Sequence, residues 1–309
     1  MWQAINVKKI QKIFSSVFSH AASPVSGGPV GCHLASLESS SPLLLSSPHS
    51  GRHYSEDFLA MASLPKHELE RMEDRFTDLL LQDAPSYGVS LVQAHFPRSF
   101  CDVNRDWREL DGAMFIPPLP SYPLIRSSKV DAGYGVIPRC SAPGKAIYRF
   151  CLPHTEAERR LSTCWEPYQQ ALQKKQQILT GRFGFCVLLD VHSMPPLPQK
   201  RRCDIVLGDL HGRACSPILT DFLEESFTQR GYHVQRNTPY AGGYITNRYG
   251  QPAQNQHALQ IEINRACYLN LNTLKPHKKF KHVHRDINEI LSQTASWLSH
   301  DGHHLLGSI

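Results

Sequence analysis

The sequence predicts an α/β fold, a three-layer α/β/α sandwich around a mostly parallel sheet. Two observations support this prediction. Short apolar segments of strand length alternate along the chain with helical segments, an order typical of parallel sheets. In addition, residues 185–190 (FCVLLD) open with five apolar residues without alternation, as expected for a strand covered on both faces.

The first elements follow residue 41. Residues 42–46 (PLLLS) form a short apolar strand, and residues 89–94 alternate like a second strand. Residues 67–82 predict a helix because their apolar side chains recur at helical spacing. Residues 97–150 are rich in proline, glycine and arginine and predict long, ordered loops.

The second half continues the alternation. A long helix is expected over residues 155–179, where Thr155 and Glu158 form a capping box. After the strand at 185–190, we expect three further strands, a helix between the first two, and a closing amphipathic helix. These are strands at 203–207, 232–236 and 258–263, and helices near 216–230 and at 282–300.

The N-terminal segment has a different composition. Residues 1–40 contain no acidic residue before Glu38 and are rich in serine, as in a transit peptide, but they contain no arginine. We therefore expect a disordered or targeting-like tail outside the fold, followed by a single domain over residues 41–309. A cytoplasmic location is expected, with an organellar location as the alternative.

Composition excludes several classes of protein. The 309 residues are 41% hydrophobic, enough for a sizeable core, yet no apolar run approaches the roughly 18–20 residues of a membrane span. The net charge of +6 lies largely near the two ends without a recognised DNA-binding motif, so we expect no nucleic-acid binding. The nine cysteines include no Cys-x-x-Cys pair, which favours a reduced, intracellular chain.

Polar side chains collect where predicted strands end. The first strand leads to His49, the strand at 185–190 leads to Asp190 and His192, and the strand at 258–263 carries Glu262 between two isoleucines. Ligands of open α/β sheets lie at the carboxyl ends of the strands, so we expect these side chains to meet there. Such a gathering of His and Glu is typical of a metal hydrolase.

Each of these residues also has a structural interpretation. An Asp-x-His pair fits a hydrogen-bonded core histidine beside a surface aspartate, and His49 fits a simple turn. Glu262 fits an edge strand that faces solvent. In the functional interpretation, Asp190 holds the second ring nitrogen of His192 or a neighbouring group. Glu262 is then a general base whose pKa is raised by partial burial.

Other catalytic machinery is missing from the sequence. It has no Gly-x-Ser-x-Gly elbow, no Walker-type loop and no His-Glu-x-x-His motif. Residues 133–138 (GYGVIP) begin like a dinucleotide loop, but Pro138 replaces the third glycine and a turn is expected. The terminal His300, His303 and His304 are expected to be solvated rather than to bind a metal.

Seven polar or glycine-containing segments follow one another along the chain. They are SPHSGR (47–52), EDRFTD (73–78), FPRSFCDVNR (96–105), DVHSMP (190–195), DIVLGD (204–209), NTPYAGGY (237–244) and HALQIEINR (257–265). In this order they resemble motifs of the N-formylglutamate amidohydrolase family, which is related to zinc carboxypeptidases and aspartoacylase-type deacylases. The resemblance implies a carboxypeptidase-like α/β/α sandwich around a mixed sheet.

The resemblance also implies a metal site. One zinc ion would be held by His49, His192 and an acidic residue between them. Carboxypeptidases have this acid three residues after the first histidine, but Arg52 occupies that position here. We therefore expect the third ligand to be Asp74, with Glu73 as the alternative, and only one of the two can face the metal.

Further roles follow from the same resemblance. Glu262 matches the general base, and Arg105 matches a clamp for the substrate carboxylate, with Asn104 beside it. Arg98 either binds a second carboxylate or the oxyanion, or only braces its loop. The role of Arg248 stays open because the family's arginine lies nearer position 247.

The predicted activity is zinc-dependent hydrolysis of N-formyl-L-glutamate, a small-molecule N-acyl amino acid, to formate and L-glutamate, as in histidine degradation. Zinc-activated water would attack the formyl carbon with Glu262 as base. Two alternatives stay open. One is a deacylase or peptidase for another N-acyl amino acid or peptide, and the other is a non-catalytic family member that serves as a binding protein.

Overall fold

A seven-stranded sheet lies at the centre of the computed structural model, which describes residues 28–33, 35, 40–119, 123–198 and 202–302. The strand order is β1-β3-β2-β6-β9-β7-β8. Strands β4 (Cys140–Ala142) and β5 (Lys145–Ala146) form a separate hairpin. The seven strands of the sheet are β1 (Val30–His33), β2 (Leu43–Ser47), β3 (Ser90–Ala94), β6 (Cys186–Met194), β7 (Ile205–Gly208), β8 (Val234–Arg236) and β9 (Gln256–Asn264).

The sheet is mixed, with a parallel centre. Neighbouring strands β3, β2, β6 and β9 are parallel. At one edge β1 is antiparallel to β3, and at the other β7 is antiparallel to β9 and parallel to β8. The predicted α/β fold with a mostly parallel sheet is therefore confirmed. Because β2, β6 and β9 are parallel neighbours, their carboxyl ends lie at one edge of the sheet.

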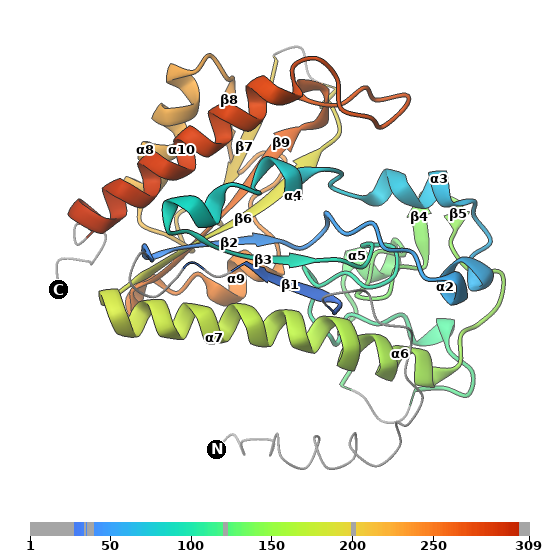
Figure 1. The fold of residues 1–309 in the computed structure, drawn as a ribbon. Helices are drawn as coiled ribbons and strands as arrows, with labels where there is room; N and C mark the ends of the chain where they lie inside the picture. The colour runs from blue at the N-terminus through green and yellow to red at the C-terminus, as the bar shows by residue number, and fades with distance from the viewer. Residues whose placement is uncertain (1–27, 34, 36–39, 120–122, 199–201, 303–309) are drawn as a thin grey trace.

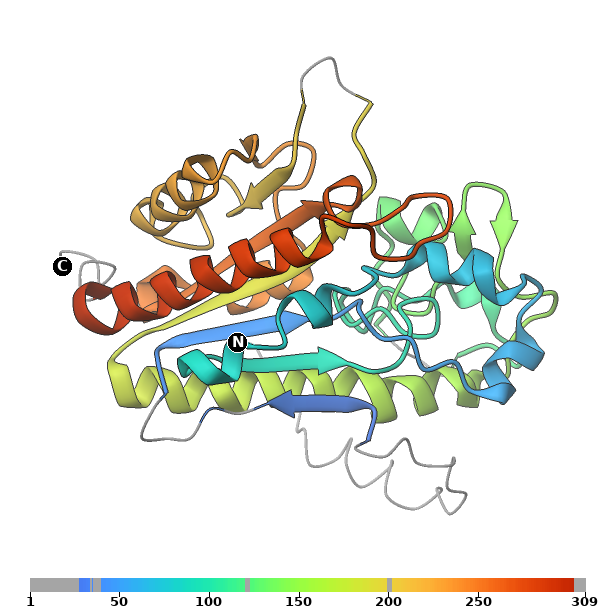
Figure 2. The ribbon, with the colours of Figure 1, turned by 45° about the horizontal axis from the view of Figure 1, so that its top comes forward.

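Helices cover both faces of this sheet (Figures 1 and 2). Helix α7 runs along one face, while α8 and α10 lie over the other. No helix within the described residues is both long and apolar enough to cross a membrane. The helices are α2 (Glu56–Met61), α3 (Lys66–Leu69), α4 (Thr77–Leu80), α5 (Ser128–Asp131), α6 (His154–Arg160), α7 (Glu166–Phe183), α8 (Pro217–Gln229), α9 (Tyr244–Tyr249) and α10 (Phe280–Asp301).

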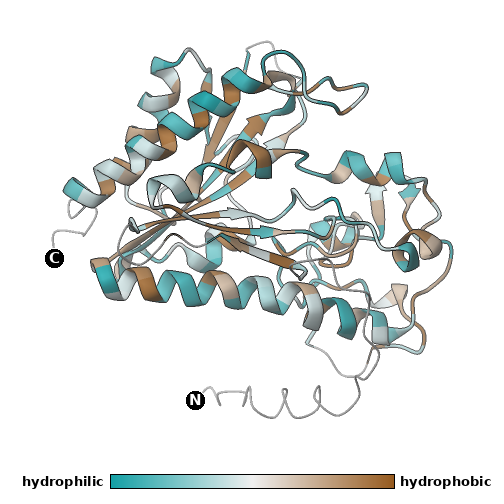
Figure 3. Cartoon of the chain, viewed as in Figure 1, coloured by the Kyte–Doolittle hydropathy of each residue, from teal (hydrophilic) through white to brown (hydrophobic). Residues whose placement is uncertain are grey.

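The alternation of side chains along β6 produces two separate cores. Val187, Leu189 and Val191 pack in the cluster that contains residues of α8 and α10. Cys186 and Leu188 point to the opposite side and pack in the cluster of α7 and α9. Hydrophobic colour accordingly dominates the central strands, whereas α7 and α10 carry hydrophilic residues (Figure 3). This burial on both faces explains the uninterrupted apolar run in the sequence.

The helix expected over residues 67–82 is wrong as a continuous element. Helix α3 passes into a 3-10 turn, η1 (Glu70–Met72), and α4 begins only at Thr77. Between them Glu73 is extended, and Phe76 has a left-handed φ of 68°. The N–H of Asp74 donates to the carbonyl of His49 at 3.0 Å. This long-range contact overrides the local helical pattern and places Asp74 beside β2.

The helix expected at 155–179 also differs. It consists of α6, a π-helical turn η4 (Leu161–Trp165) and α7. The N-cap of α6 is Pro153, which makes no side-chain cap bond, so the predicted Thr155–Glu158 capping box is wrong. Strand boundaries shift by at most four residues, and α8 and α10 begin and end within two residues of the expected limits.

Part of the segment that we expected outside the fold belongs to the sheet. Strand β1 pairs antiparallel with β3, with Val30 opposite Ala94. The boundary at residue 40 is therefore too late for this strand. Its four residues, VGCH, are too few to produce a recognisable alternation. Residues 1–27, which carry the transit-peptide-like composition, lie outside the described residues.

Candidate metal centre

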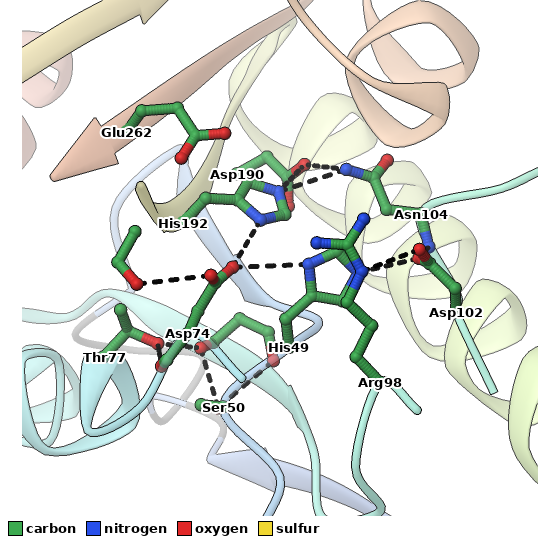
Figure 4. A network of polar contacts seen from close by, with 12 residues as sticks. His49, Ser50, Asp74, Thr77, Arg98, Asp102, Asn104, Asp190, His192 and Glu262 are labelled. Atoms are coloured by element: carbon green, nitrogen blue, oxygen red, sulfur yellow. Dashed lines mark hydrogen bonds and ion pairs between the residues drawn. The ribbon is translucent and has the colours of Figure 1, made fainter. Parts of the chain in front are cut away.

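Three ligand-type side chains meet at the carboxyl edge of the central strands (Figure 4). His49 follows β2, and His192 lies near the carboxyl end of β6. Asp74 lies between η1 and α4. One donor atom of each lies within 4.8 Å of the other two, and all three residues are buried. The structure therefore brings together the three residues that were expected as metal ligands.

Asp190 and Glu262, the other two residues expected at strand ends, lie on the same face of the sheet as His192. His192 lies directly opposite Glu262 in the register of β6 and β9, and Asp190 lies on the same face two residues earlier. Strand β9 lies between β6 and β7, and Glu262 is only 8% exposed. The interpretation of Glu262 as a solvent-facing residue on an edge strand is therefore excluded.

Asp74 rather than its neighbour Glu73 faces the histidines. Oε1 of Glu73 accepts the hydroxyl of Tyr54 at 2.6 Å, and Oε2 accepts Nη1 of Arg75 at 2.9 Å. Burial raises the pKa of Glu73 to about 7, although these two partners act in the opposite direction. The break in the predicted helix turns the two side chains apart, so that only Asp74 faces the histidines.

Both histidines present the same ring nitrogen to Asp74. Oδ2 of Asp74 lies 3.3 Å from Nδ1 of His49 and 2.9 Å from Nδ1 of His192. The opposite nitrogens face other carboxylates, because Nε2 of His49 lies 2.7 Å from Oδ1 of Asp102 and Nε2 of His192 lies 2.8 Å from Oδ2 of Asp190. An ionised carboxylate only accepts hydrogen bonds, so each Nε2 carries a proton. Each Nδ1 faces Asp74 at the centre of the cluster, where it would offer its lone pair to a bound cation.

Asp74 and His192 shift each other's pKa in opposite directions. Burial would raise the pKa of Asp74, but hydrogen bonds from His192 and His49 hold it well below its usual range. Burial would likewise lower the pKa of His192, but the Asp190 charge and hydrogen bonds to Asp190 and Asp74 raise it well above its usual range. Binding of a cation at Nδ1 of His192 therefore competes with protonation of the ring.

This donor set fits a divalent metal ion. Two imidazole Nδ1 lone pairs and a carboxylate oxygen repel one another unless a proton or a cation lies among them. Two histidines and one carboxylate also form a common ligand set of catalytic zinc sites, with a fourth position for water or substrate. The aspartates behind the two rings fix the tautomer that a metal ligand needs.

The surroundings of Glu262 shift its pKa toward neutrality. Its Oε1 accepts Nε2 of Gln260 at 2.9 Å. Burial and, to a smaller extent, the charge of Asp74 raise the pKa of Glu262 to about 7, while His192 and Arg98 partly offset them. A carboxyl with this pKa both accepts and returns a proton near neutral pH.

Two arginines that were expected to bind substrate flank Asp102. Nε of Arg98 donates to Oδ2 of Asp102 at 2.9 Å, and the Arg98 side chain is 27% exposed. Arg105 lies 3.9 Å from the same oxygen, and its Nε donates to the carbonyl of Tyr134 at 3.1 Å. Figure 4 shows the Arg98 guanidinium beside His49 and Asp102. These two cations place positive charge next to the cluster.

Asn104 has protein partners rather than an open position for substrate. It is 5% exposed, and its Oδ1 accepts the N–H of Ile245 at 2.8 Å. Its Nδ2 donates to Oδ2 of Asp190 at 3.4 Å. Asn104 therefore links the start of α9 to the aspartate behind His192, a role that was not expected, and its substrate contact stays a prediction.

Three residues of the site were missed by sequence reasoning. Asp102 is the counterpart of Asp190 for the other histidine, and Arg265 and Ser193 bind the second oxygen of Asp74. All three lie inside motifs quoted above. Asp102 could have been found by looking for one acidic partner for each histidine expected to bind a metal, although 53 residues separate it from His49.

Two further predicted positions lie apart from the cluster. Arg248 is exposed on α9 and stacks on the ring of Tyr249, 5.7 Å from its centroid, so its role stays open. His300 is exposed and contacts the carbonyl of Ser296 at 2.8 Å, while residues 303 and 304 lie outside the described residues.

Comparisons with known proteins agree with this arrangement. A family model described as N-formylglutamate amidohydrolase matches residues 41–269. The N-formylglutamate deformylases of Pseudomonas putida and Pseudomonas aeruginosa are both 29% identical to this chain, over 237 and 243 residues respectively. Each match covers 74% of this chain and 82% of the relative. The crystal structure of N-formylglutamate amidohydrolase from Ralstonia eutropha superposes with a TM-score of 0.83 and 33% identity, covering 87% of this chain and 98% of that one. The chain therefore belongs to the N-formylglutamate amidohydrolase family, as its motifs indicated.

Proposed function

We propose that this chain is a zinc-dependent amidohydrolase that converts N-formyl-L-glutamate to formate and L-glutamate. The observation that carries the proposal is the convergence of Nδ1 of His49 and Nδ1 of His192 on Oδ2 of Asp74. The names of the curated relatives, N-formylglutamate deformylase, support the choice of substrate.

Proton transfer is assigned to Glu262. A bound zinc ion supplies polarisation of the formyl carbonyl and a lowered pKa for water. Glu262 takes a proton from the attacking water as its oxygen bonds to the formyl carbon. It then delivers that proton to the glutamate nitrogen as the carbon–nitrogen bond breaks. The pKa of about 7 suits both directions of transfer.

Substrate orientation is assigned to Arg105 and Arg98. N-formyl-L-glutamate carries two carboxylates, and planar guanidinium groups bind carboxylates through paired hydrogen bonds. Asp102 holds Nε of Arg98 and lies near Nε of Arg105, which fixes both side chains beside the cluster. Arg98, whose guanidinium lies beside His49 (Figure 4), is the second candidate to bind a carboxylate or the negative charge that develops on the formyl oxygen.

The test is formate release from N-formyl-L-glutamate by purified protein as isolated, after chelation, and after zinc is restored. Loss of formate release on chelation and its return with zinc are expected. Bound zinc without formate release would direct the search to other N-acyl amino acids or peptides. Bound zinc without hydrolysis of any of them would favour the binding-protein alternative.

A cytoplasmic location is part of the same proposal. All nine cysteines are free, and six of them are buried.

A further inference from the structure

Arg265 and Ser193 contact the side of Asp74 that faces away from the histidines. Oδ1 of Asp74 accepts Nη2 of Arg265 at 3.1 Å and the hydroxyl of Ser193 at 3.2 Å. The Asp74 side chain is 2% exposed and that of Arg265 is 13% exposed, so water screens this ion pair weakly. The two oxygens of one carboxylate thus have separate sets of partners.

Arg265 is fixed independently of Asp74. It follows β9 directly, three residues after Glu262, in the 3-10 turn η6 (Arg265–Cys267). Its Nε donates to the Ser193 hydroxyl at 3.0 Å, and its Nη1 donates to the carbonyl of Arg71 at 3.1 Å. These contacts anchor the guanidinium at the end of the sheet, so it can hold Asp74 in one orientation rather than follow it.

The chemical consequence concerns how a carboxylate binds a cation. A carboxylate with two available oxygens can bind a metal ion through both and thereby occupy two coordination positions. The lone pairs of Asp74 Oδ1 are directed at Arg265 and Ser193, which leaves Oδ2 alone facing the two Nδ1 atoms.

We propose that Arg265 and Ser193 are positioning residues that restrict Asp74 to coordination through one oxygen and so preserve an open coordination position. The inference rests on the metal site of the proposed function and adds two residues to it. Neither residue touches the substrate in this scheme. Both act on the orientation of a ligand.

The test uses the full-length protein loaded with zinc or with cobalt(II) alone. Zinc affinity is measured by competition with a chromophoric chelator, and the cobalt protein is studied by visible absorption, which distinguishes four-coordinate from five-coordinate cobalt. The variants are Arg265→Met, Arg265→Lys and Ser193→Ala. The matched control is Arg52→Met, which removes an arginine from a bidentate pair with Asp78 and leaves Asp74 untouched.

We expect Arg265→Met to weaken zinc binding by about 10- to 100-fold and to shift cobalt absorption toward the weaker five-coordinate type. Ser193→Ala should produce a smaller shift in the same direction, and Arg265→Lys should restore part of the affinity. The control should keep both properties. Thermal unfolding shows which variants remain folded, and Ser193→Ala carries the test if Arg265→Met does not fold.

Unchanged zinc affinity and an unchanged cobalt spectrum in folded Arg265→Met and Ser193→Ala would overturn the inference while leaving the proposed function standing. If the unaltered protein binds neither zinc nor cobalt, both the inference and the metal site fail. An equal loss in Arg52→Met would show that the effect is general destabilisation, which also overturns the inference.

Discussion

The substitution Asp102→Asn tests how the cluster is made ready for a metal. Asp102 is buried and accepts Nε2 of His49 at 2.7 Å, so it holds the proton on the ring nitrogen that faces away from Asp74. Asparagine has nearly the same shape but no charge. Its amide group can also donate to Nε2, which would move the ring proton to Nδ1 and remove the lone pair that a metal needs.

The size of the effect follows from the kind of bond that is lost. A hydrogen bond to a charged group contributes about 1.5–3 kcal/mol, which corresponds to roughly 10- to 150-fold in an equilibrium constant. Loss of the partner behind a metal-binding histidine typically costs about 10- to 100-fold in metal affinity. We therefore expect Asp102→Asn to weaken zinc binding by about 10- to 100-fold, with a parallel loss of kcat/KM at limiting zinc.

The assay is competition for zinc against a chromophoric chelator, with Asp78→Asn as the matched control. Asp78 forms two bonds of 2.7 Å with Arg52 but contacts neither histidine. The control should bind zinc like the unaltered protein. A zinc affinity of Asp102→Asn within twofold of the unaltered protein, or an equal loss in the control, would refute the tautomer argument.

Four other outcomes are expected. His192→Ala should lose bound zinc, measured by elemental analysis, together with formate release; full zinc occupancy would remove this residue from the site. Glu262→Gln should keep zinc but lower kcat by about 10²–10⁴-fold, and an unchanged rate would mean that another group is the base. Arg105→Ala should lower kcat/KM for acidic substrates by about 10- to 100-fold through loss of a charge-assisted bond, mainly in KM, whereas unchanged kinetics would rule out the clamp. Burial lowers the pKa of His257 to about 4, so below pH 6.5 the unfolded chain binds a proton that the folded chain does not. The free energy of unfolding should therefore fall by about 3 kcal/mol between pH 6.5 and 4. Urea unfolding of His257→Gln should show a shallower pH dependence than that of the unaltered protein, and an identical dependence would contradict this.

The central strands were predictable because burial on both faces leaves a direct trace in the sequence. Residues 186–189 are apolar without interruption, and the strand that contains them lies in the middle of the sheet. Helix α10 was equally visible from the periodicity of its apolar face. Strand β1 was not, because four residues at a sheet edge bury little apolar surface.

The break between α3 and α4 shows the limit of local patterns. The apolar residues of this segment fit a helix, but the chain opens at Glu73 because Asp74 hydrogen-bonds the backbone of His49. That contact joins positions 25 residues apart, and no window of helical length contains both. The same interruption decides which of the two acids reaches the histidines.

The candidate site was predictable to the extent that its residues lie on strands or in family motifs. His192 and Glu262 meet because they occupy matched positions of neighbouring parallel strands. The supporting residues depend on side-chain geometry across distant loops. Asp102 and Arg265 reach His49 and Asp74 from 53 and 191 positions away, which spacing alone does not reveal.

The most direct test of the central claim is a crystal structure of the zinc-loaded protein, with anomalous diffraction measured on both sides of the zinc absorption edge. The account predicts one zinc peak bound by Nδ1 of His49, Nδ1 of His192 and Oδ2 of Asp74, with Oδ1 of Asp74 still on Arg265. A zinc peak on other ligands, or none at this cluster in protein with stoichiometric zinc, would contradict it.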